Sequence, residues 1–465
     1  MISKSSKATR HTLPSRVKRH RNRPSHCPTG EIRRKMKLCS ALLLALPLIG
    51  AQQLHQCSHG KSVKTSSPSW INNQELKDVN DGRIPVTPAR HTVDLDLPPA
   101  ERWLEIGQHY ANQSDLIIEY FESMLPHAAV VAIDKIAAHL VGYEGFGDFG
   151  DEMKGYAEGL GLDLGYVVAA NLVYQLESIG VNCSNWNNTG PTGQCGDDSV
   201  DEIVWLESEH YTKTFNDVVQ TGYCTSVVTE EAGGGILHGR NLDWNLEQEL
   251  RSMIITVDFT RGGELLYSGT TIVSFVGILN AMAPGPNGFS FSMDARCQGG
   301  KIWSNLLEAL AAGAMTPCQH SRTVMEAATD FASAVSLFES GNLVDDGYFI
   351  VGGAADGEGA IVSRARNRNV DTWMIDESDA QSGWYRLETN YDHWQDVPSA
   401  DDRRTPGYAN MEAVGKDSIN TANLFSDVMT VWPTYNPHTD ITCIMSAKYG
   451  DYDCSIWMDP EDDLE

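Results

Sequence analysis

The spacing of apolar residues changes once along the chain and divides it into a helical part and a strand-rich part. From residue 98 to about residue 180, apolar residues recur every three or four positions, which predicts amphipathic helices. After Gly222 they alternate with polar residues, and short turns separate the runs, as in antiparallel strands. Three hairpins are predicted from these runs: 224–229 with 236–244, 252–260 with 264–273, and 347–354 with 359–366.

Three further elements are predicted in the second part. Residues 302–314 and 321–339 have the spacing of helices, and residues 384–390 have that of a strand. Helices before and between runs of antiparallel strands favour an α+β fold, in which sheets pack face to face with helices outside. A chain of 465 residues is long enough for one large core or for two segments that share one.

The first 82 residues are left out of the fold prediction. Residues 1–35 are basic and aperiodic, and they form a leader or an upstream segment. Residues 36–51 combine a basic start, a short apolar run and a small-residue end, which predicts a secretory signal peptide. Residues 52–82 are rich in Ser, Gln and Asn and predict a flexible spacer. The folded part is expected to begin near Ile84.

The formal net charge of -27 is unevenly distributed, because the first 38 residues hold twelve Lys or Arg and one acidic side chain. Everything downstream is therefore more acidic than the total suggests, which argues against nucleic acid as a partner. Carboxylates are partly protonated at acidic pH, so an acidic working environment would reduce this charge.

Entry into the secretory pathway is also favoured by sequence patterns around asparagines and cysteines. The predicted N-glycosylation acceptors are Asn112, Asn182 and Asn187. The oxidising route allows disulfides. The closely spaced cysteine pairs are Cys183 with Cys195, Cys297 with Cys318, and Cys443 with Cys454. If these pairs form, Cys224 remains a thiol, although spacing does not determine connectivity.

Cys224 lies where the pattern changes, and Arg240 and Asp243 follow sixteen and nineteen positions later. A glycine-rich turn between the two strand-like runs would bring Asp243 back beside Cys224. Arg240 and Asp243 are three apart, so a regular strand would point them to opposite faces unless Gly239 hosts a bulge. These residues alone fit two interpretations equally: a nucleophile with its attendant groups, or a disulfide cysteine on a hairpin with surface charges.

A catalytic cysteine reacts as the thiolate and needs a base, but no histidine stands in an obvious Cys-His protease pattern. One solution is cleavage of the chain before Cys224. The freed α-amino group, with a pKa near ~8, could then accept the thiol proton. Asp243 could orient this amine, and Arg240 could offset developing negative charge.

Several motifs resemble those of the family that contains N-acylethanolamine-hydrolysing acid amidase and acid ceramidase, over roughly residues 84–446. They include 224–226 (CTS), 238–243 (HGRNLD), 348–353 (YFIVGG), 388–394 (ETNYDHW) and 401–405 (DDRRT). One position departs from the family. Where the amidase has Ser-Gly-Asp-Glu-Arg, this chain has SMDAR at 292–296, and the side chain of Ala295 cannot accept a hydrogen bond.

The resemblance implies an N-terminal-nucleophile hydrolase with the αββα fold, in which two stacked antiparallel sheets are flanked by helices. The precursor would cleave itself between Tyr223 and Cys224 at acidic pH. The products would be a helical α-subunit, 83–223, and a β-subunit with the catalytic core, 224–465, which stay associated as a heterodimer.

The resemblance also implies roles for individual residues. Cys224 would be the nucleophile and its own amine the base, and Arg240 and Asp243 would position them. Asn390 would help to form the oxyanion hole, and Arg404 would support the site. Without the resemblance, Asn390 is typical of a strand-ending turn, and the arginine run at 403–404 is typical of solvated ion pairs.

The predicted function is a self-processing cysteine amidase that hydrolyses N-acylethanolamines to fatty acid and ethanolamine at acidic pH. The setting would be the lysosome, another acidic secretory compartment or the exterior, with peripheral contact to membranes that hold the lipid substrate. The chemistry needs no metal or cofactor. The alternatives are ceramidase-type hydrolysis of N-acylsphingosine, an acylase for non-lipid amides, and a secreted lipid-binding glycoprotein that does not process itself.

Overall fold

The computed structural model describes most of the chain after residue 81. The described residues are 82–124, 135, 147–177, 223–244, 246–296, 314–379, 382–398 and 401–460. They all belong to one compact unit, which lies within residues 46–465. The predicted signal peptide, the spacer, the helix at 302–314, Asn182, Asn187, and the cysteines at 183, 195 and 297 lie outside the described residues.

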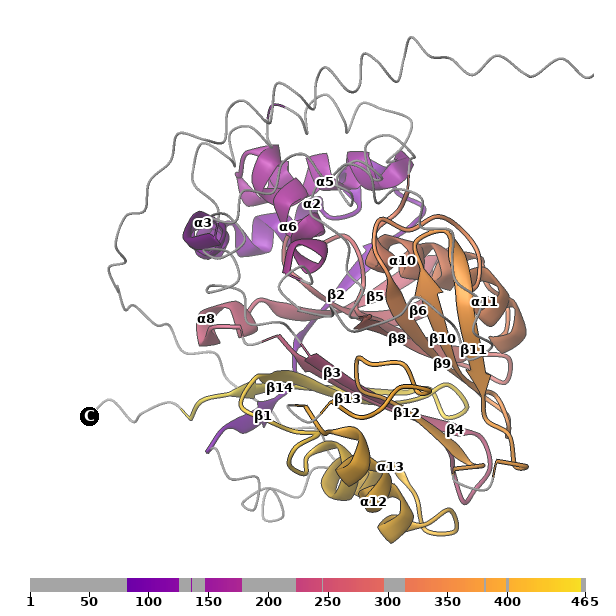
Figure 1. Cartoon of the computed structure of the whole chain (residues 1–465). Helices are drawn as coiled ribbons and strands as arrows, with labels where there is room; N and C mark the ends of the chain where they lie inside the picture. Colours follow the sequence, from indigo (N-terminus) through magenta and orange to yellow (C-terminus); the bar gives the residue numbers. More distant parts are fainter. Residues whose placement is uncertain are drawn as a thin grey trace, which may run out of the picture. The chain divides into compact units, whose positions relative to one another are not determined.

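Two β-sheets lie face to face, and helices cover their outer sides (Figure 1). The first sheet contains, in spatial order, β1 (Ile84–Val86), β14 (Asp451–Met458), β13 (Thr439–Ser446), β4 (Ile236–Asp243), β3 (Tyr223–Glu230) and β12 (Tyr385–Glu388). The second contains β11 (Arg368–Met374), β10 (Gly359–Ala365), β9 (Gly347–Gly353), β8 (Phe289–Ala295), β7 (Asn280–Ala283), β6 (Glu264–Ile272), β5 (Ile254–Arg261) and β2 (Ala89–Asp94). The predicted α+β sandwich is confirmed.

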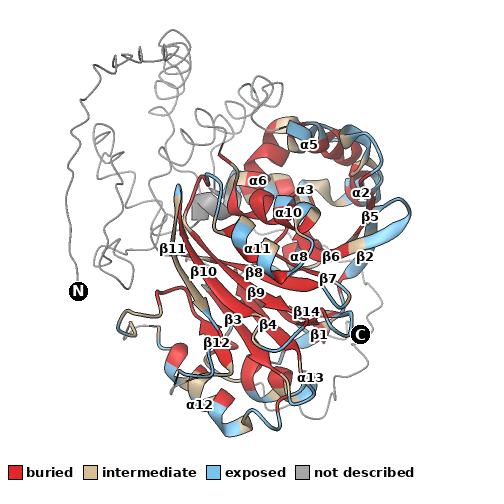
Figure 2. Cartoon of the chain, turned by 90° about the vertical axis from the view of Figure 1, so that its right-hand side faces the viewer, coloured by how far each residue is buried: buried red, intermediate tan, exposed pale blue. Residues whose placement is uncertain are grey.

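Helices from both parts of the chain form the outer layers. The N-terminal group is α2 (Leu104–Tyr110), α3 (Ser114–Met124), α5 (Gly147–Leu160) and α6 (Leu164–Glu177). Helices α10 (Pro317–Ala327) and α11 (Phe331–Phe338) pack on the second sheet. The first sheet is covered by α12 (Arg404–Val414), α13 (Thr421–Asn423) and the π-helix Leu424–Met429. A short helix, α8 (Gln248–Arg251), follows β4. Strands β4, β9 and β10 are buried along their whole length because both of their faces are covered (Figure 2).

The three predicted hairpins are confirmed as β3–β4, β5–β6 and β9–β10, and the predicted strand at 384–390 is β12. The single helix predicted at 321–339 is wrong, because two helices occupy this stretch. Asp330 explains the break between the two helices. Its side chain accepts the Ser333 backbone N–H, and the Ser333 side chain accepts the Asp330 backbone N–H. This capping box starts a new helix three residues after α10 ends.

The segment that precedes Cys224 contributes an edge strand to each sheet. β1 pairs with β14 in antiparallel fashion at one edge of the first sheet. β2 pairs with β5 at one edge of the second sheet, and this pairing is parallel. The residues before and after Cys224 are therefore joined by backbone hydrogen bonds in two separate sheets.

Candidate active site

Cys224 is the second residue of β3, and its side chain is buried between the sheets. It is not disulfide-bonded. Its backbone N–H donates to the side-chain oxygen Oδ1 of Asn390 at 2.6 Å. The peptide bond between Tyr223 and Cys224 therefore lies in an ordered strand, directly opposite Asp243 and Leu242 of β4.

Arg240 lies on the same face of the first sheet as Cys224. The register of β3 and β4 pairs Ser226 with Arg240, and Ser226 is two residues from Cys224, so all three side chains share one face. The Arg240 Nη2 lies 3.8 Å from the Cys224 Sγ. Nη1 donates to Asn280 Oδ1 at 3.1 Å, and Nη2 also donates to the Met293 carbonyl at 3.0 Å. A guanidinium held in this way would favour the thiolate form of the sulfur.

Asp243 lies on the opposite face of β4, because the register with β3 is regular and Gly239 hosts no bulge. On the other side of β4, the register with β13 shifts between Thr439 and Ile441. Its carboxylate accepts hydrogen bonds from Asn436 Nδ2 and Thr439 Oγ1, both at 2.7 Å. Burial raises the pKa of Asp243 to about 6, although the nearby charge of Arg403 works against this. The structure thus places Arg240 beside the sulfur of Cys224 and places Asp243 on the opposite face of the first sheet.

Arg403 makes a contact with Cys224 that the sequence does not predict. Its Nη1 donates to the Cys224 carbonyl oxygen and, at 3.3 Å, to Thr225 Oγ1. Its Nη2 donates to Asn390 Oδ1 at 3.0 Å, and Asp401 holds the guanidinium through two oxygens at 2.7 and 2.8 Å. Arg403 is buried, so this pair is not a solvated surface pair.

Arg404 is buried one residue later, but it serves the loop that carries Asn390. Its guanidinium lies 4.2 Å from the centre of the Tyr391 ring and donates to the carbonyl oxygens of Tyr391 and Asp392, the latter at 3.0 Å. The two adjacent arginines have identical side chains and a shared sequence context. Only the fold shows which of them faces Cys224.

Asn390 is fixed by four polar contacts. Besides the contacts of Oδ1 with Cys224 and Arg403, its Nδ2 donates to the Ala295 carbonyl at 2.8 Å, and its backbone N–H donates to Glu388 Oε1 at 2.7 Å. Its φ of 70° lies in the left-handed region, which asparagine tolerates better than most residues. The backbone of Ala295 thus holds Asn390, although its side chain cannot.

A buried polar chain continues from Cys224 into the space between the sheets. Ser226 Oγ and Ser292 Oγ are 2.9 Å apart, and Ser292 Oγ lies 2.9 Å from His238 Nε2. His238 Nδ1 completes the chain at 3.0 Å from Ser290 Oγ. Burial lowers the pKa of His238 to about 3, so its imidazole is neutral under ordinary conditions and brings no charge to the site.

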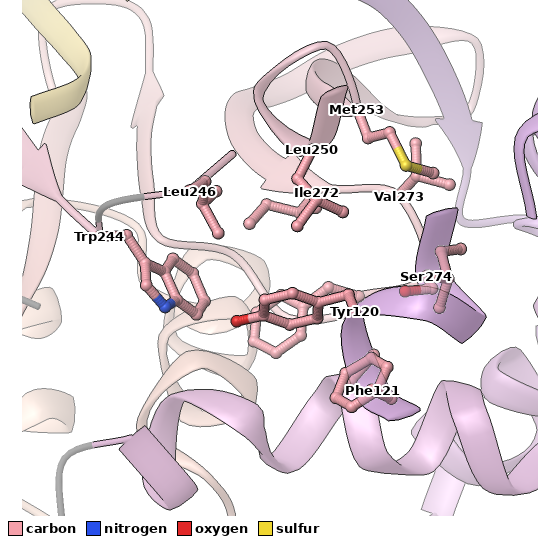
Figure 3. Close-up of a pocket in the computed structure, with 12 residues that line it drawn as sticks. Tyr120, Phe121, Trp244, Leu246, Leu250, Met253, Ile272, Val273 and Ser274 are labelled. Carbon is pink, nitrogen blue, oxygen red and sulfur yellow. The ribbon is translucent and has the colours of Figure 1, made fainter. Parts of the chain in front are cut away.

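An apolar cavity of about 450 Å³, including space open to solvent, lies between the N-terminal helices and the second part of the chain (Figure 3). The side chains that line it, apart from Ser274, are apolar or aromatic: Ile117, Tyr120, Phe121, Ala170, Trp244, Leu246, Leu250, Met253, Ile272, Val273 and Phe275. Asn171 of α6 holds the loop at 274–276 through the Ser274 carbonyl and the Val276 N–H, at 3.0 and 2.9 Å.

The predicted disulfide between Cys443 and Cys454 is confirmed, and it joins directly opposed residues of β13 and β14. The predicted pair of Cys297 and Cys318 is wrong, because Cys318 is a thiol. Cys318 is completely buried near the start of α10, in close contact with Gly277. Cys318 thus belongs to the packed interior, and its spacing from Cys297 along the chain could not predict this.

Replacing Asp440 with asparagine is expected to change how stability depends on pH. Burial raises the pKa of Asp440 to about 7 in the folded chain, where its carboxylate accepts the N–H groups of Trp244 and Leu246. The folded state therefore binds more protons than the unfolded state between about pH 4 and pH 7, and this carboxyl costs stability as pH rises.

His238 and His320, with pKa values lowered by burial to about 3 and about 4, act in the opposite direction below about pH 6.5, so the native curve mixes both effects. Relative to native protein, the Asp440→Asn variant should gain stability as pH rises from about 4 to 7, by up to ~1.4 kcal/mol per pH unit. Thermal unfolding across this range measures the difference. Asp427→Asn, at an exposed position, is the control. Parallel curves for native protein and the Asp440 variant would contradict the expectation.

Comparison with known proteins identifies the family. A model of the linear amide C–N hydrolases, choloylglycine hydrolase family, matches residues 224–415, so that the match begins at Cys224. A model described as the beta subunit of N-acylethanolamine-hydrolyzing acid amidase matches residues 86–145. N-acylethanolamine-hydrolyzing acid amidase of Cavia porcellus is 31% identical over 375 residues, which cover 78% of this chain and 89% of that protein. The chain belongs to the N-acylethanolamine-hydrolysing acid amidase and acid ceramidase family.

Members of both branches of this family are similar to the chain. Acid ceramidase of Heterocephalus glaber is 26% identical over 391 residues, which cover 79% of this chain and 85% of that protein. A solved Caenorhabditis elegans N-acylethanolamine-hydrolyzing acid amidase ortholog is 29% identical and covers 50% of this chain and 99% of its own, with a TM-score of 0.44. As a member of the family, the chain is a hydrolase of linear amide C–N bonds with an N-terminal-nucleophile fold. Among the described residues, no helix is long and apolar enough to cross a membrane.

Proposed function

We propose that this chain is a self-processing cysteine amidase that hydrolyses N-acylethanolamines to fatty acid and ethanolamine at acidic pH. The observation that carries the proposal is the position of Cys224. Its sulfur lies 3.8 Å from the guanidinium of Arg240, its N–H donates to Asn390 Oδ1, and its carbonyl oxygen accepts from Arg403 Nη1. The sulfur, the N–H and the carbonyl oxygen of Cys224 thus each contact a side chain that has a role in the proposed reaction.

Maturation begins with attack of the Cys224 sulfur on the carbonyl carbon of Tyr223. The peptide C–N bond breaks as the new C–S bond forms, and the thiol proton ends on the departing nitrogen of Cys224. Water then hydrolyses the thioester, which leaves a carboxylate on Tyr223 and a free α-amine on Cys224. This amine occupies the position from which the amide N–H contacts Asn390 Oδ1 at 2.6 Å in the intact chain.

The matured site can repeat this chemistry on a substrate amide. The α-amine accepts the thiol proton, the sulfur attacks the acyl carbon, and the proton passes to the leaving ethanolamine nitrogen. Water releases the fatty acid from the thioester. Asn390 contributes to the oxyanion hole, and Arg240, Asp243, Arg403 and Arg404 hold the reacting groups. The apolar cavity between the two parts of the chain offers a site for the acyl chain.

The proposal includes the cellular location of this activity. The signal peptide, the acidic composition and Asn112 favour a lysosomal or other acidic secretory location. Asn112 lies exposed on the 3-10 helix Ala111–Gln113, where a glycan has room. Ceramide is the second candidate substrate, and the similarity to acid ceramidases at 26% identity supports it less than the 31% identity to an amidase.

The test is incubation of the purified precursor at acidic pH, followed by N-terminal sequencing and an assay with palmitoylethanolamide, ceramide and a soluble acyl amide. We expect a new chain that starts at Cys224 and a preference for palmitoylethanolamide. A preference for ceramide, or for the soluble amide, would reassign the substrate. A chain that binds lipid yet stays uncut and inactive would refute the enzyme and favour a lipid-binding glycoprotein.

A further inference from the structure

Two carboxyl groups that no step above uses face each other between the sheets, beside Arg240. Glu388 ends β12 directly opposite Ser226, and Ser226 lies opposite Arg240, so their side chains form a row on one face of the first sheet. Asp294 reaches this row from β8 of the second sheet, with its Oδ1 3.6 Å from the Arg240 Nε. Asp294 and Glu388 are 0% and 3% exposed.

The surroundings hold too little positive charge for two carboxylates. Arg240 faces Asp294 from β4, and Arg403 approaches the pair from the start of α12, but Arg403 is already ion-paired with Asp401 at 2.7 Å. The Tyr348 hydroxyl of β9 also lies near Glu388, but it is neutral and donates to Asp392. The imidazole of His238 lies beside Arg240 on β4 and is neutral as well. A second buried negative charge would therefore have no counter-ion of its own.

The two carboxyls accordingly differ in charge. Burial raises the pKa of Glu388 well above its ordinary value, and the neighbouring Asp294 raises it further. Burial also raises the pKa of Asp294, but the charge of Arg240 acts against it. Asp294 is thus the ionised member, and Glu388 keeps the proton.

Hydrogen-bond geometry agrees with one proton held between the two groups. Within the part of the chain that the structure describes, neither oxygen of Asp294 nor Oε2 of Glu388 accepts a hydrogen bond of normal geometry, although the Ser226 side chain lies close enough to lower the pKa of Asp294. The other oxygen of Glu388, Oε1, accepts the backbone N–H of Asn390 at 2.7 Å. A proton on Oε2 would satisfy Glu388 and Asp294 together, at little cost to either.

We propose that Glu388 is a positioning residue for the reactions of Cys224, and that it acts only while it shares a proton with Asp294. This inference rests on the proposed function. In the protonated form, one negative charge faces Arg240, whose Nη2 stays 3.8 Å from the sulfur. Loss of the proton would add a second negative charge beside the guanidinium. Arg240 would then be drawn toward the carboxyls, and the thiolate of Cys224 would be disfavoured.

The test is the pH profile of the Glu388→Gln variant, measured for self-cleavage of the precursor and for amide hydrolysis by the matured protein, from about pH 4 to about pH 9. Glutamine reproduces the protonated carboxyl, since its oxygen can accept from Asn390 and its amide can donate to Asp294. We expect the alkaline limb of the profile to move up by about one pH unit or more, which is about tenfold in relative rate above that limb. The control is Glu412→Gln, which replaces an exposed carboxylate on α12.

A second variant approaches the pair from the other sheet. In Asp294→Asn, ionisation of Glu388 would restore one negative charge beside Arg240 instead of adding a second one. We therefore expect the alkaline limb of the native profile to be lost, and a limb unchanged from native would overturn the inference.

The outcomes separate this inference from the proposed function. An alkaline limb that stays in place in the Glu388→Gln variant overturns the inference while leaving the enzyme intact. Failure of this variant to fold at acidic pH also overturns it, because glutamine mimics the state assigned to Glu388. Native protein that neither cuts itself nor hydrolyses amides at any pH would instead refute the proposed function.

Discussion

Replacement of Cys224 by alanine is expected to leave the precursor as one intact polypeptide with no measurable amide hydrolysis. The variant lacks the sulfur that we propose attacks the Tyr223 carbonyl, and loss of a nucleophile in such enzymes typically lowers the rate by ~10⁶-fold. The change removes one buried atom, so the fold should survive. Gel electrophoresis after acid incubation, together with mass spectrometry of the products, measures the outcome.

Cys318 provides a matched control, because it is the other buried thiol among the described cysteines. Cys318→Ala removes the same atom from the packed core near α10 and is expected to be processed at the native bond. If Cys224→Ala were cut between residues 223 and 224 at the native rate, another protease would be responsible, and self-processing would be refuted.

The second large effect is expected at Glu152, which ties the two predicted subunits together. This buried residue of α5 accepts hydrogen bonds from Arg322 Nη2 of α10 at 2.7 Å, from Trp103 Nε1 at 2.9 Å and from Arg102 Nη1 at 2.9 Å. Burial works to raise the pKa of Glu152, but the charge and hydrogen bonds of Arg322 outweigh it and leave the pKa lowered. The carboxylate therefore stays ionised as the pH falls.

Glu152→Gln removes the buried counter-ion of Arg322 and leaves only the partly exposed Glu326, 3.2 Å from Arg322 Nε, to offset its charge. Breaking a buried ion pair typically costs ~3–5 kcal/mol. We expect a lower unfolding temperature of the precursor. After cleavage, we expect the two chains to separate on gel filtration, with loss of activity on dilution. Glu158→Gln, on the exposed face of the same helix, is the control. Equal stability of the two variants would show that Glu326 alone is enough to offset Arg322 and that the contact with Glu152 is not essential.

The parts of the fold that are local in sequence could be predicted, and the parts that depend on distant partners could not. The hairpin of β3 and β4 follows from alternating residues around a glycine-rich turn, because both strands and the turn lie within 21 residues, 223–243. The edge strands β1 and β2 escaped prediction. β1 has three residues, and β2 pairs with β5, whose residues lie far along the chain. Nothing local marks either strand as paired.

The candidate site shows the same limit at the level of single residues. The regular register between β3 and β4 explains why Arg240 reaches the sulfur and Asp243 does not share its face, and this was foreseeable from their spacing. Arg403 could not be distinguished from Arg404 by sequence. At the start of α12 the Arg403 side chain points toward Cys224, whereas the Arg404 side chain points toward Tyr391. Asp294 and Glu388 meet only because two sheets stack, and no sequence pattern connects them.

The two edge strands that come from residues before the proposed cleavage site have a consequence for how the protein can be made. A chain synthesised from Cys224 onward would lack β1 and β2, so β14 and β5 would each expose a row of backbone donors and acceptors. Open sheet edges of this kind promote aggregation. Synthesis as a single chain thus protects both margins of the sandwich. The proposed scission would then yield an N-terminus that a separately expressed fragment would not readily present in soluble form.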